Sequence, residues 1–114
     1  MDNCLFCKIA AGEIPSSKVY EDESVLAFRD INPQAKVHVL VIPKKHIQSW
    51  YAAKDEDDAA LAHMMRVVSV VAEKEGIAGT GFRVVSNAGS DACQSVAHFH
   101  MHVLGGEQLN DRMA

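Results

Sequence analysis

The sequence predicts an α+β domain built on a five-stranded antiparallel sheet with one long and one short helix. Five segments have the β-branched or alternating composition of strands, and two segments place apolar residues at helical spacing. Their order is short helix, hairpin, strand, long helix and two strands, which favours a sheet with one face under the long helix. The length of 114 residues suits one domain, so residues 1–114 are expected to form a single unit.

The N-terminal part is predicted to form a short helix followed by a β-hairpin. The helix is expected over 5–12, where apolar residues recur before a glycine. The hairpin strands are expected at 19–21 and 25–29. Turn residues then end the second strand, which places Asp30 and Ile31 at a strand edge where a ligand could meet them.

A central strand is predicted over 37–42, because this run is apolar on both faces and Pro43 closes it. His38 is the exception in the run. It shares a face with Leu40 and Ile42. It is therefore either a core histidine whose ring nitrogens are hydrogen-bonded or part of a site on that face of the sheet.

The long helix is expected to begin at Asp55 as its N-cap, with Asp58 three residues later, and to stop before Gly76. His63 is expected to face solvent, because it lies off the apolar stripe. That stripe is predicted to consist of Leu61, Met64, Met65, Val68, Val71 and Ala72.

Two strands are expected after the long helix. The first covers 82–87, and a loop at 88–96 separates it from a run of histidines that forms the last strand. Small and hydroxyl residues dominate this loop, so it can bring N–H and O–H donors close to a bound oxyanion. Residues 107–114 contain few apolar side chains and are predicted to be a loose tail.

The last predicted strand carries three histidines at alternate positions. In an extended chain His98, His100 and His102 share one face, while Phe99 and the other apolar residues share the opposite face. The sequence therefore predicts that the histidine face forms a functional site and that the apolar face packs in the core. Three imidazoles could bind one metal ion only if the strand bends, whereas neighbouring ones could bind one phosphate group, and the spacing allows both.

Composition and charge argue against several classes of partner. The chain has 11 basic and 15 acidic residues and a net charge of −4. This balance argues against a broad basic surface that would bind nucleic acid or an anionic membrane. No run is long enough to span a bilayer and residues 1–4 lack signal-peptide features, so a cytoplasmic location is expected. Two of the three cysteines are spaced as Cys4-x-x-Cys7, which suits reduced thiols for metal or redox use.

Four motifs spread over nearly the whole chain identify a family resemblance: Cys4-Leu5-Phe6-Cys7-Lys8-Ile9, Phe28-Arg29-Asp30-Ile31, His38-Val39-Leu40-Val41-Ile42-Pro43-Lys44-Lys45-His46, and Gln94-Ser95-Val96 before His98-x-His100-x-His102. Through them the chain resembles the histidine triad (HIT) family, and within it the nucleotide-binding branch of phosphoramidase-like hydrolases. The resemblance implies a HIT-like fold, a homodimer, and attack on the α-phosphorus of a purine nucleotide or nucleoside phosphoramidate with release of an amine or another leaving group.

The resemblance assigns the nucleophile to His100, with its ring oriented by the backbone of the first histidine of the motif. A neutral imidazole has an ordinary pKa of about 6.5, so it is already nucleophilic near neutral pH. By the same resemblance, His102 and His38 would line the phosphate. Ser95 would lie near the phosphate and the leaving group.

The resemblance also implies how the nucleotide is held. Asp30 would accept hydrogen bonds from the ribose hydroxyls. Asn87 and the amides of Ser95 and Val96 would donate to charge in the transition state, where one lost donor typically costs on the order of 3 kcal/mol. The purine would enter an apolar slot formed by Leu5, Phe6, Ile9, Phe28 and Ile31, of which Ile9 and Phe28 suit an ordinary core equally well.

A zinc site is a further implication of the resemblance. Its ligands would be Cys4, Cys7, His46 and His98. Two thiolates and two imidazoles make a closed tetrahedral set, so the zinc would be structural and would fasten the N-terminal helix to the sheet. Redox use is the rival interpretation of the cysteine pair, but no thioredoxin-like βαβ pattern surrounds it.

Two other functions are consistent with the sequence. One is a zinc-dependent hydrolase in which the histidine run holds a catalytic zinc, and the other is a non-catalytic nucleotide-binding or interaction module. The chain also departs from the family pattern in two places that bear on the leaving group. Cys93 stands where a glycine is usual before Gln-Ser-Val, and the tail after Gly106 lacks the aromatic, proline-rich ending of many relatives.

Overall fold

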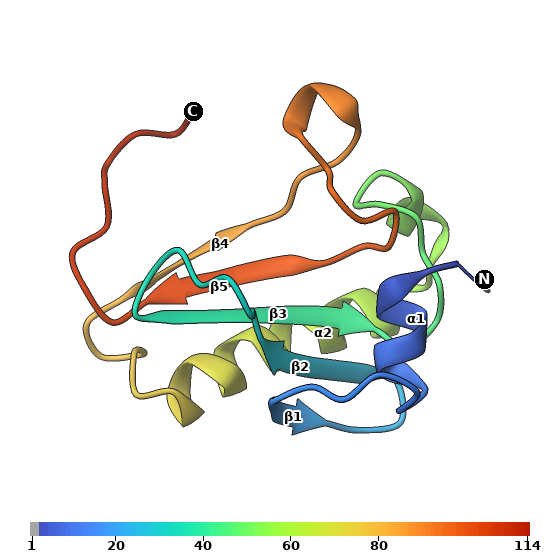
Figure 1. Ribbon diagram of the computed structural model, residues 1–114, viewed down its shortest axis with the longest axis horizontal. Coiled ribbons are helices and arrows are strands. Elements are labelled where there is room, and N and C mark those ends of the chain that lie inside the picture. The colour runs from blue at the N-terminus through green and yellow to red at the C-terminus, as the bar shows by residue number, and fades with distance from the viewer. Residues whose placement is uncertain (1–2) are drawn as a thin grey trace.

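Figure 1 shows the computed structural model of the protein, which describes residues 3–114. Met1 and Asp2, on which part of the expected location rests, lie outside the described residues. Over 3–114, no helix has the length and apolar character needed to cross a membrane. The elements in chain order are α1 (Leu5–Ala10), β1 (Lys18–Glu21), β2 (Val25–Arg29), β3 (Val37–Pro43), the 3₁₀ helix η1 (Ala52–Asp55), α2 (Asp58–Lys74), β4 (Phe82–Val85), the 3₁₀ helix η2 (Ser90–Ala92) and β5 (Met101–Gly105).

The five strands form one antiparallel sheet in the order β1-β2-β3-β5-β4 (Figure 1). The predicted fold class is therefore confirmed, and the apolar β3 lies at the centre of the sheet. In the β3–β5 ladder, His38 lies opposite Leu104 and Leu40 lies opposite His102. Because diagonal neighbours of adjacent strands share a face, this register brings His38 next to the histidine run.

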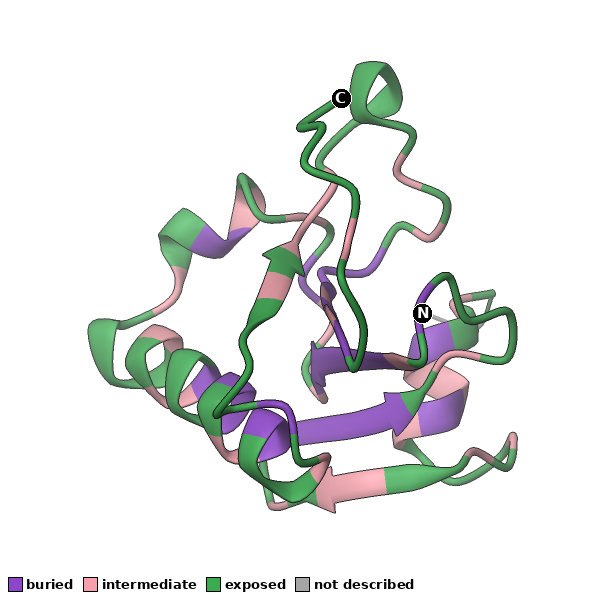
Figure 2. Cartoon of the chain, turned by 90° about the vertical axis from the view of Figure 1, so that its left-hand side faces the viewer, coloured by how far each residue is buried: buried purple, intermediate pink, exposed green. Residues whose placement is uncertain are grey.

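Each face of the sheet packs against one helix. On one face α2 covers a core to which the histidine run contributes Phe99, Met101 and Val103, as the alternation predicts. On the other face α1 adds Phe6 and Ile9 to a smaller core. Figure 2 shows the buried residues concentrated in the central strands and along α2. The histidines thus lie on the α1 side, away from the larger core.

Two strand boundaries differ from the prediction. β5 begins at Met101, so His98 and His100 lie in the irregular segment that leads into the strand. β4 ends at Val85 rather than at residue 87. In the described chain β3 pairs with β5 only from Met101 onward and β4 pairs with it only from His102 onward, which explains both differences.

α2 begins two residues later than predicted. Asp57 is the N-cap, and its Oδ1 accepts from the Ala60 amide at 2.8 Å. Asp55 instead ends η1. Residues 55–58 are all acidic, so composition alone does not select the cap. The predicted stop is correct, because Gly76 follows the helix with a φ of +74°.

The buried face of α2 also differs from the predicted stripe. Met65 is 73% exposed, whereas Val67, which was not assigned to the stripe, is 1% exposed. His63 was expected to face solvent, but its Nε2 lies 2.6 Å from Asp22 Oδ2 and ties α2 to the β1–β2 turn. This partner is 41 residues away in the sequence, beyond the reach of any local pattern.

The cap assignment predicts that Asp57→Ala lowers the free energy of unfolding by about 1 kcal/mol, because the helix loses an acceptor for one of its first amides. Asp55→Ala is the matched control: it removes the same charge two residues away and should change stability by less than about 0.5 kcal/mol. Urea unfolding followed by circular dichroism measures both. Equal losses in the two variants would contradict the assignment.

Candidate functional site

A cavity of about 560 Å³ lies on the face of the sheet that carries α1. Small-ligand sites commonly have volumes of about 300–1,000 Å³. The cavity wall is built by α1, by the end of β2 with the turn that follows it, and by the segment that leads into β5. The structure brings ten of the predicted site residues together here: Leu5, Phe6, Ile9, Phe28, Asp30, Ile31, Ser95, Val96, His100 and His102.

The apolar part of the cavity has a buried floor and an exposed rim. Phe6, Ile9 and Phe28 belong to the core on the α1 side and form the floor. Leu5 is 44% exposed and Ile31 is 91% exposed at the rim. A flat apolar ligand that covered these rim side chains would remove their apolar surface from water, which favours binding.

The His100 ring is held by backbone and aromatic contacts. Its Nδ1 donates to the His98 carbonyl oxygen at 2.7 Å, which fixes the hydrogen of the neutral ring on Nδ1 and leaves the lone pair on Nε2. The Phe6 ring packs against it edge to face, with centroids 5.0 Å apart and planes at 89°. Ser86 Oγ donates to the His100 carbonyl oxygen at 2.8 Å. A buried imidazole with a free Nε2 lone pair can act as a nucleophile.

A chain of hydrogen bonds assigns the tautomers of His38 and His102. The Gln34 amide donates to His38 Nδ1 at 3.1 Å, so His38 carries its hydrogen on Nε2. His38 Nε2 donates in turn to His102 Nδ1 at 2.9 Å. The remaining nitrogen of His102, Nε2, is then an N–H donor. His38 does not line the cavity itself, but it contacts two residues that do: its Nε2 lies 2.9 Å from His102 Nδ1 and 3.5 Å from Asp30 Oδ2.

Burial keeps these two rings neutral. It lowers the pKa of His38, although the negative charge of Asp30 partly opposes the shift. Burial, followed by the neighbouring His100 and His38 rings, lowers the pKa of His102 to about 4. Near neutral pH His102 Nε2–H is therefore a hydrogen-bond donor without positive charge.

This electrostatic arrangement predicts that stability falls as the pH drops from 6.5 toward about 4. In that window the unfolded chain binds a proton at His102 while the folded chain does not, so protonation favours unfolding. Thermal melts at about pH 7 and about pH 5 should show a smaller acid-induced loss of Tm for His102→Gln than for the unmodified chain. Identical losses would contradict this account of His102.

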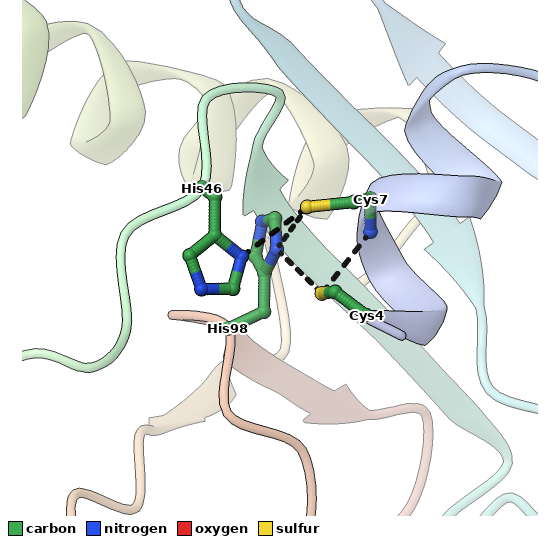
Figure 3. A group of neighbouring side chains, drawn as sticks. All are labelled: Cys4, Cys7, His46 and His98. Carbon is green, nitrogen blue, oxygen red and sulfur yellow. Dashed lines mark hydrogen bonds between the residues drawn. The ribbon is translucent and has the colours of Figure 1, made fainter. Parts of the chain in front are cut away.

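A second group of side chains joins α1 to the loop after β3 and to the segment before β5. The group consists of Cys4, Cys7, His46 and His98, whose sulfur and nitrogen atoms all lie within 4.8 Å of one another (Figure 3). Cys4 Sγ lies 3.3 Å from His98 Nδ1, and Cys7 Sγ lies 3.2 Å from His46 Nδ1. Cys4 is also the N-cap of α1 and accepts from the Cys7 amide at 3.3 Å.

The donor set fits a tetrahedral ion. Metal–sulfur bonds of about 2.3 Å and metal–nitrogen bonds of about 2.0–2.1 Å place tetrahedral S and N ligands about 3.5 Å apart. His98 Nε2 donates to the Pro43 carbonyl oxygen at 2.8 Å, which turns the Nδ1 lone pair toward the sulfurs. Burial and the adjacent Cys4 raise the pKa of the Cys7 thiol, which a bound cation would reverse.

The three histidines of the run do not share one partner. His98 faces the thiols, His100 donates to a carbonyl, and His102 accepts from His38. Asp30, His38 and His102 also lie close enough together to hold an ion. However, the Gln34 amide occupies His38 Nδ1, so the hydrogen on His38 Nε2 blocks the nitrogen that would have to bind it.

Gln94 is a positioning residue to which the sequence pattern assigned no role. Gln94 Nε2 donates to the carbonyl oxygens of Gln48 and Val96 at 2.8 and 3.0 Å, and its Oε1 accepts from the Gly89 amide at 2.9 Å. Gln94 thus fixes both ends of the loop that presents Ser95. Asn87, by contrast, is half-buried after β4 and does not line the cavity.

Several known proteins are similar to this chain. Residues 11–109 match the HIT domain family. A "14 kDa zinc-binding protein" of Zea mays is 52% identical over 108 residues, which cover 93% of this chain and 84% of that protein. A HIT family hydrolase from Legionella pneumophila is 49% identical in sequence, and its crystal structure matches with a TM-score of 0.90. The match covers 95% of this chain and 96% of that chain. A "hypothetical histidine triad nucleotide-binding protein" of Sulfolobus tokodaii is 35% identical in sequence, and its structure matches with a TM-score of 0.76. The match covers 89% of this chain and 67% of that chain.

Proposed function

Because the chain belongs to the HIT family, we propose that it is a nucleotide-binding hydrolase that cleaves purine nucleoside phosphoramidates or related nucleotidyl conjugates. The reaction passes through a nucleotidyl-histidine intermediate on His100. The observation that carries this proposal is the 2.7 Å hydrogen bond from His100 Nδ1 to the His98 carbonyl oxygen, which leaves Nε2 as the attacking atom in a ligand-sized cavity.

The substrate is held from two sides. The purine ring occupies the apolar part of the cavity, over the floor formed by Phe6, Ile9 and Phe28. The Asp30 carboxylate accepts from the ribose hydroxyls. Its Oδ1 already accepts from the Asn32 amide at 2.8 Å, which holds the carboxylate at the end of β2. The name of the Sulfolobus protein as nucleotide-binding supports a nucleotide as the ligand class.

In the first step the His100 Nε2 lone pair forms a bond to the α-phosphorus, and the bond from phosphorus to the amine nitrogen breaks. The leaving amine takes up a proton, which the Ser95 hydroxyl on the cavity wall can relay from solvent. His102 Nε2–H, with the Ser95 and Val96 amides, donates to the phosphoryl oxygens as their charge grows. We also propose Asn87 as a donor, which requires this side chain to move toward the phosphate when substrate binds, because it does not line the cavity. Water then cleaves the phosphorus–nitrogen bond to His100 and releases the nucleoside monophosphate.

We propose that zinc is the ion held by Cys4, Cys7, His46 and His98. The zinc-binding name of the maize relative and the tetrahedral spacing of the four donors support this choice. A zinc ion closed by four protein ligands cross-links the chain and has no free position for substrate. Free thiols at this site suit a reducing compartment such as the cytoplasm.

The proposed working unit is a homodimer. β4 is an edge strand, and its Phe82 and Val84 side chains are 38% and 42% exposed. An exposed apolar edge strand tends to pair with another chain. Light scattering at micromolar concentration distinguishes a dimer from a monomer.

The function is tested by incubating the protein with a purine nucleoside 5′-phosphoramidate and measuring the nucleoside monophosphate released. We expect turnover that survives brief chelation of free metal, because the reaction uses no open metal position. Immediate loss of turnover while zinc stays bound at Cys4, Cys7, His46 and His98 would favour the zinc-dependent hydrolase. Nucleotide binding without turnover would favour a non-catalytic module.

A further inference from the structure

The candidate metal centre and the proposed nucleophile share one residue. His98 is fully buried, and its Nδ1 lies 3.3 Å from Cys4 Sγ and 3.5 Å from Cys7 Sγ. The carbonyl of the same residue accepts from His100 Nδ1 at 2.7 Å. Any shift of His98 that follows a change at the thiols therefore moves the group that orients His100.

Phe6 provides a second link between the two sites. It lies between Cys4 and Cys7 on α1 and is 5% exposed. Its ring meets His100 edge to face, with centroids 5.0 Å apart, and meets His98 in the same way at 5.9 Å. One aromatic ring thus touches a candidate metal ligand and the proposed nucleophile.

The support for Phe6 depends on α1 staying in place. α1 has only six residues, too few for a helix to be stable without tertiary contacts. Two of the four candidate ligands, Cys4 and Cys7, are at its N-cap and in its first turn. An ion bound by them would hold the helix, and with it Phe6, against the sheet.

We infer that metal occupancy at Cys4, Cys7, His46 and His98 sets the orientation of the His100 imidazole, with Phe6 as the positioning residue. The inference rests on the proposed function and goes beyond a purely structural role for the ion. Loss of the metal frees α1, withdraws Phe6 from the His100 ring, and removes one wall of the apolar slot. Metal supply would then control both nucleotide affinity and the nucleophile.

The test compares the zinc-loaded full chain with the same chain after chelator treatment, at a temperature where circular dichroism shows both to be folded. Imidazole ¹⁵N NMR without ligand reports the tautomer of His100, and calorimetry reports the Kd of adenosine monophosphate. We expect the loaded chain to show a single Nδ1–H tautomer. The stripped chain should show averaged signals and bind at least about tenfold more weakly. An unchanged His100 spectrum after stripping would overturn the inference.

If the stripped chain unfolds, the variant Phe6→Leu tests the same inference, because this variant retains all four candidate ligands. With zinc bound and no nucleotide present, it should show the same averaging of the His100 signals. Phe82→Leu makes the same change on β4, opposite Gly105, and should leave those signals as they are. Equal spectra for Phe6→Leu and the unmodified chain would contradict the positioning role.

The two readouts separate the inference from the proposed function. A loaded chain that binds no adenosine monophosphate would contradict the proposed function. The His100 spectrum would still decide whether the metal centre controls this ring.

Discussion

Replacing His100 by alanine is expected to lower kcat/KM for a purine nucleoside phosphoramidate by at least about 10⁴-fold, because the variant has no atom to form the covalent intermediate. The Kd of the nucleoside monophosphate should change by less than about fivefold, because the apolar slot and Asp30 stay in place. Steady-state kinetics and calorimetry measure the two quantities.

His63→Ala is the control for this experiment. His63 lies on α2, on the opposite side of the sheet, and contacts Asp22 rather than the cavity. Its removal should leave turnover unchanged even where stability falls. Turnover by His100→Ala at the rate of the unmodified chain would refute His100 as the nucleophile.

Replacing Cys7 by serine is expected to lower Tm by about 10 °C or more and to abolish stoichiometric zinc binding. Cys7 Sγ faces both candidate imidazole ligands, at 3.2 Å from His46 Nδ1 and 3.5 Å from His98 Nδ1. A metal that binds the folded chain contributes its binding free energy to stability, and about 2–3 kcal/mol suffices for such a shift in a domain of this size.

Cys93→Ser is the matched control for Cys7→Ser. Cys93 is exposed in the loop after η2 and is not part of the four-ligand group. Elemental analysis and thermal melting of both variants should show loss of zinc and of stability for Cys7→Ser alone. Unchanged melting of Cys7→Ser would contradict a structural metal at this site.

The features that the sequence predicted correctly depend on local periodicity. Alternation in an extended chain placed Phe99 and Met101 in the core under α2 and their histidine neighbours on the other face, although β5 begins only at Met101. Apolar composition on both faces identified β3 as the central strand. These signals need only the residues of a single element.

The features that were missed depend on partners distant in sequence or on backbone groups. The partner of His63 is Asp22, which lies 41 residues away in the sequence. The helical pattern alone therefore predicted that His63 faces solvent. The Gln34 amide and the Pro43 carbonyl fix two histidine tautomers, and a backbone group carries no residue-type signal. The apolar residues of the cavity were assigned by resemblance to a family, because neighbours such as Leu5 and Phe28 are brought together only by the fold.

The proposed reaction depends on a covalent bond between the His100 imidazole and phosphorus. This bond can be detected by rapid acid-free quenching during turnover of a purine nucleoside phosphoramidate, followed by intact-mass measurement and peptide mapping. We expect an adduct with the mass of one nucleoside monophosphate less water, located on His100 and absent from His100→Ala. An adduct on a different residue, or full turnover with no adduct at any quench time, would rule out His100 as the nucleophile.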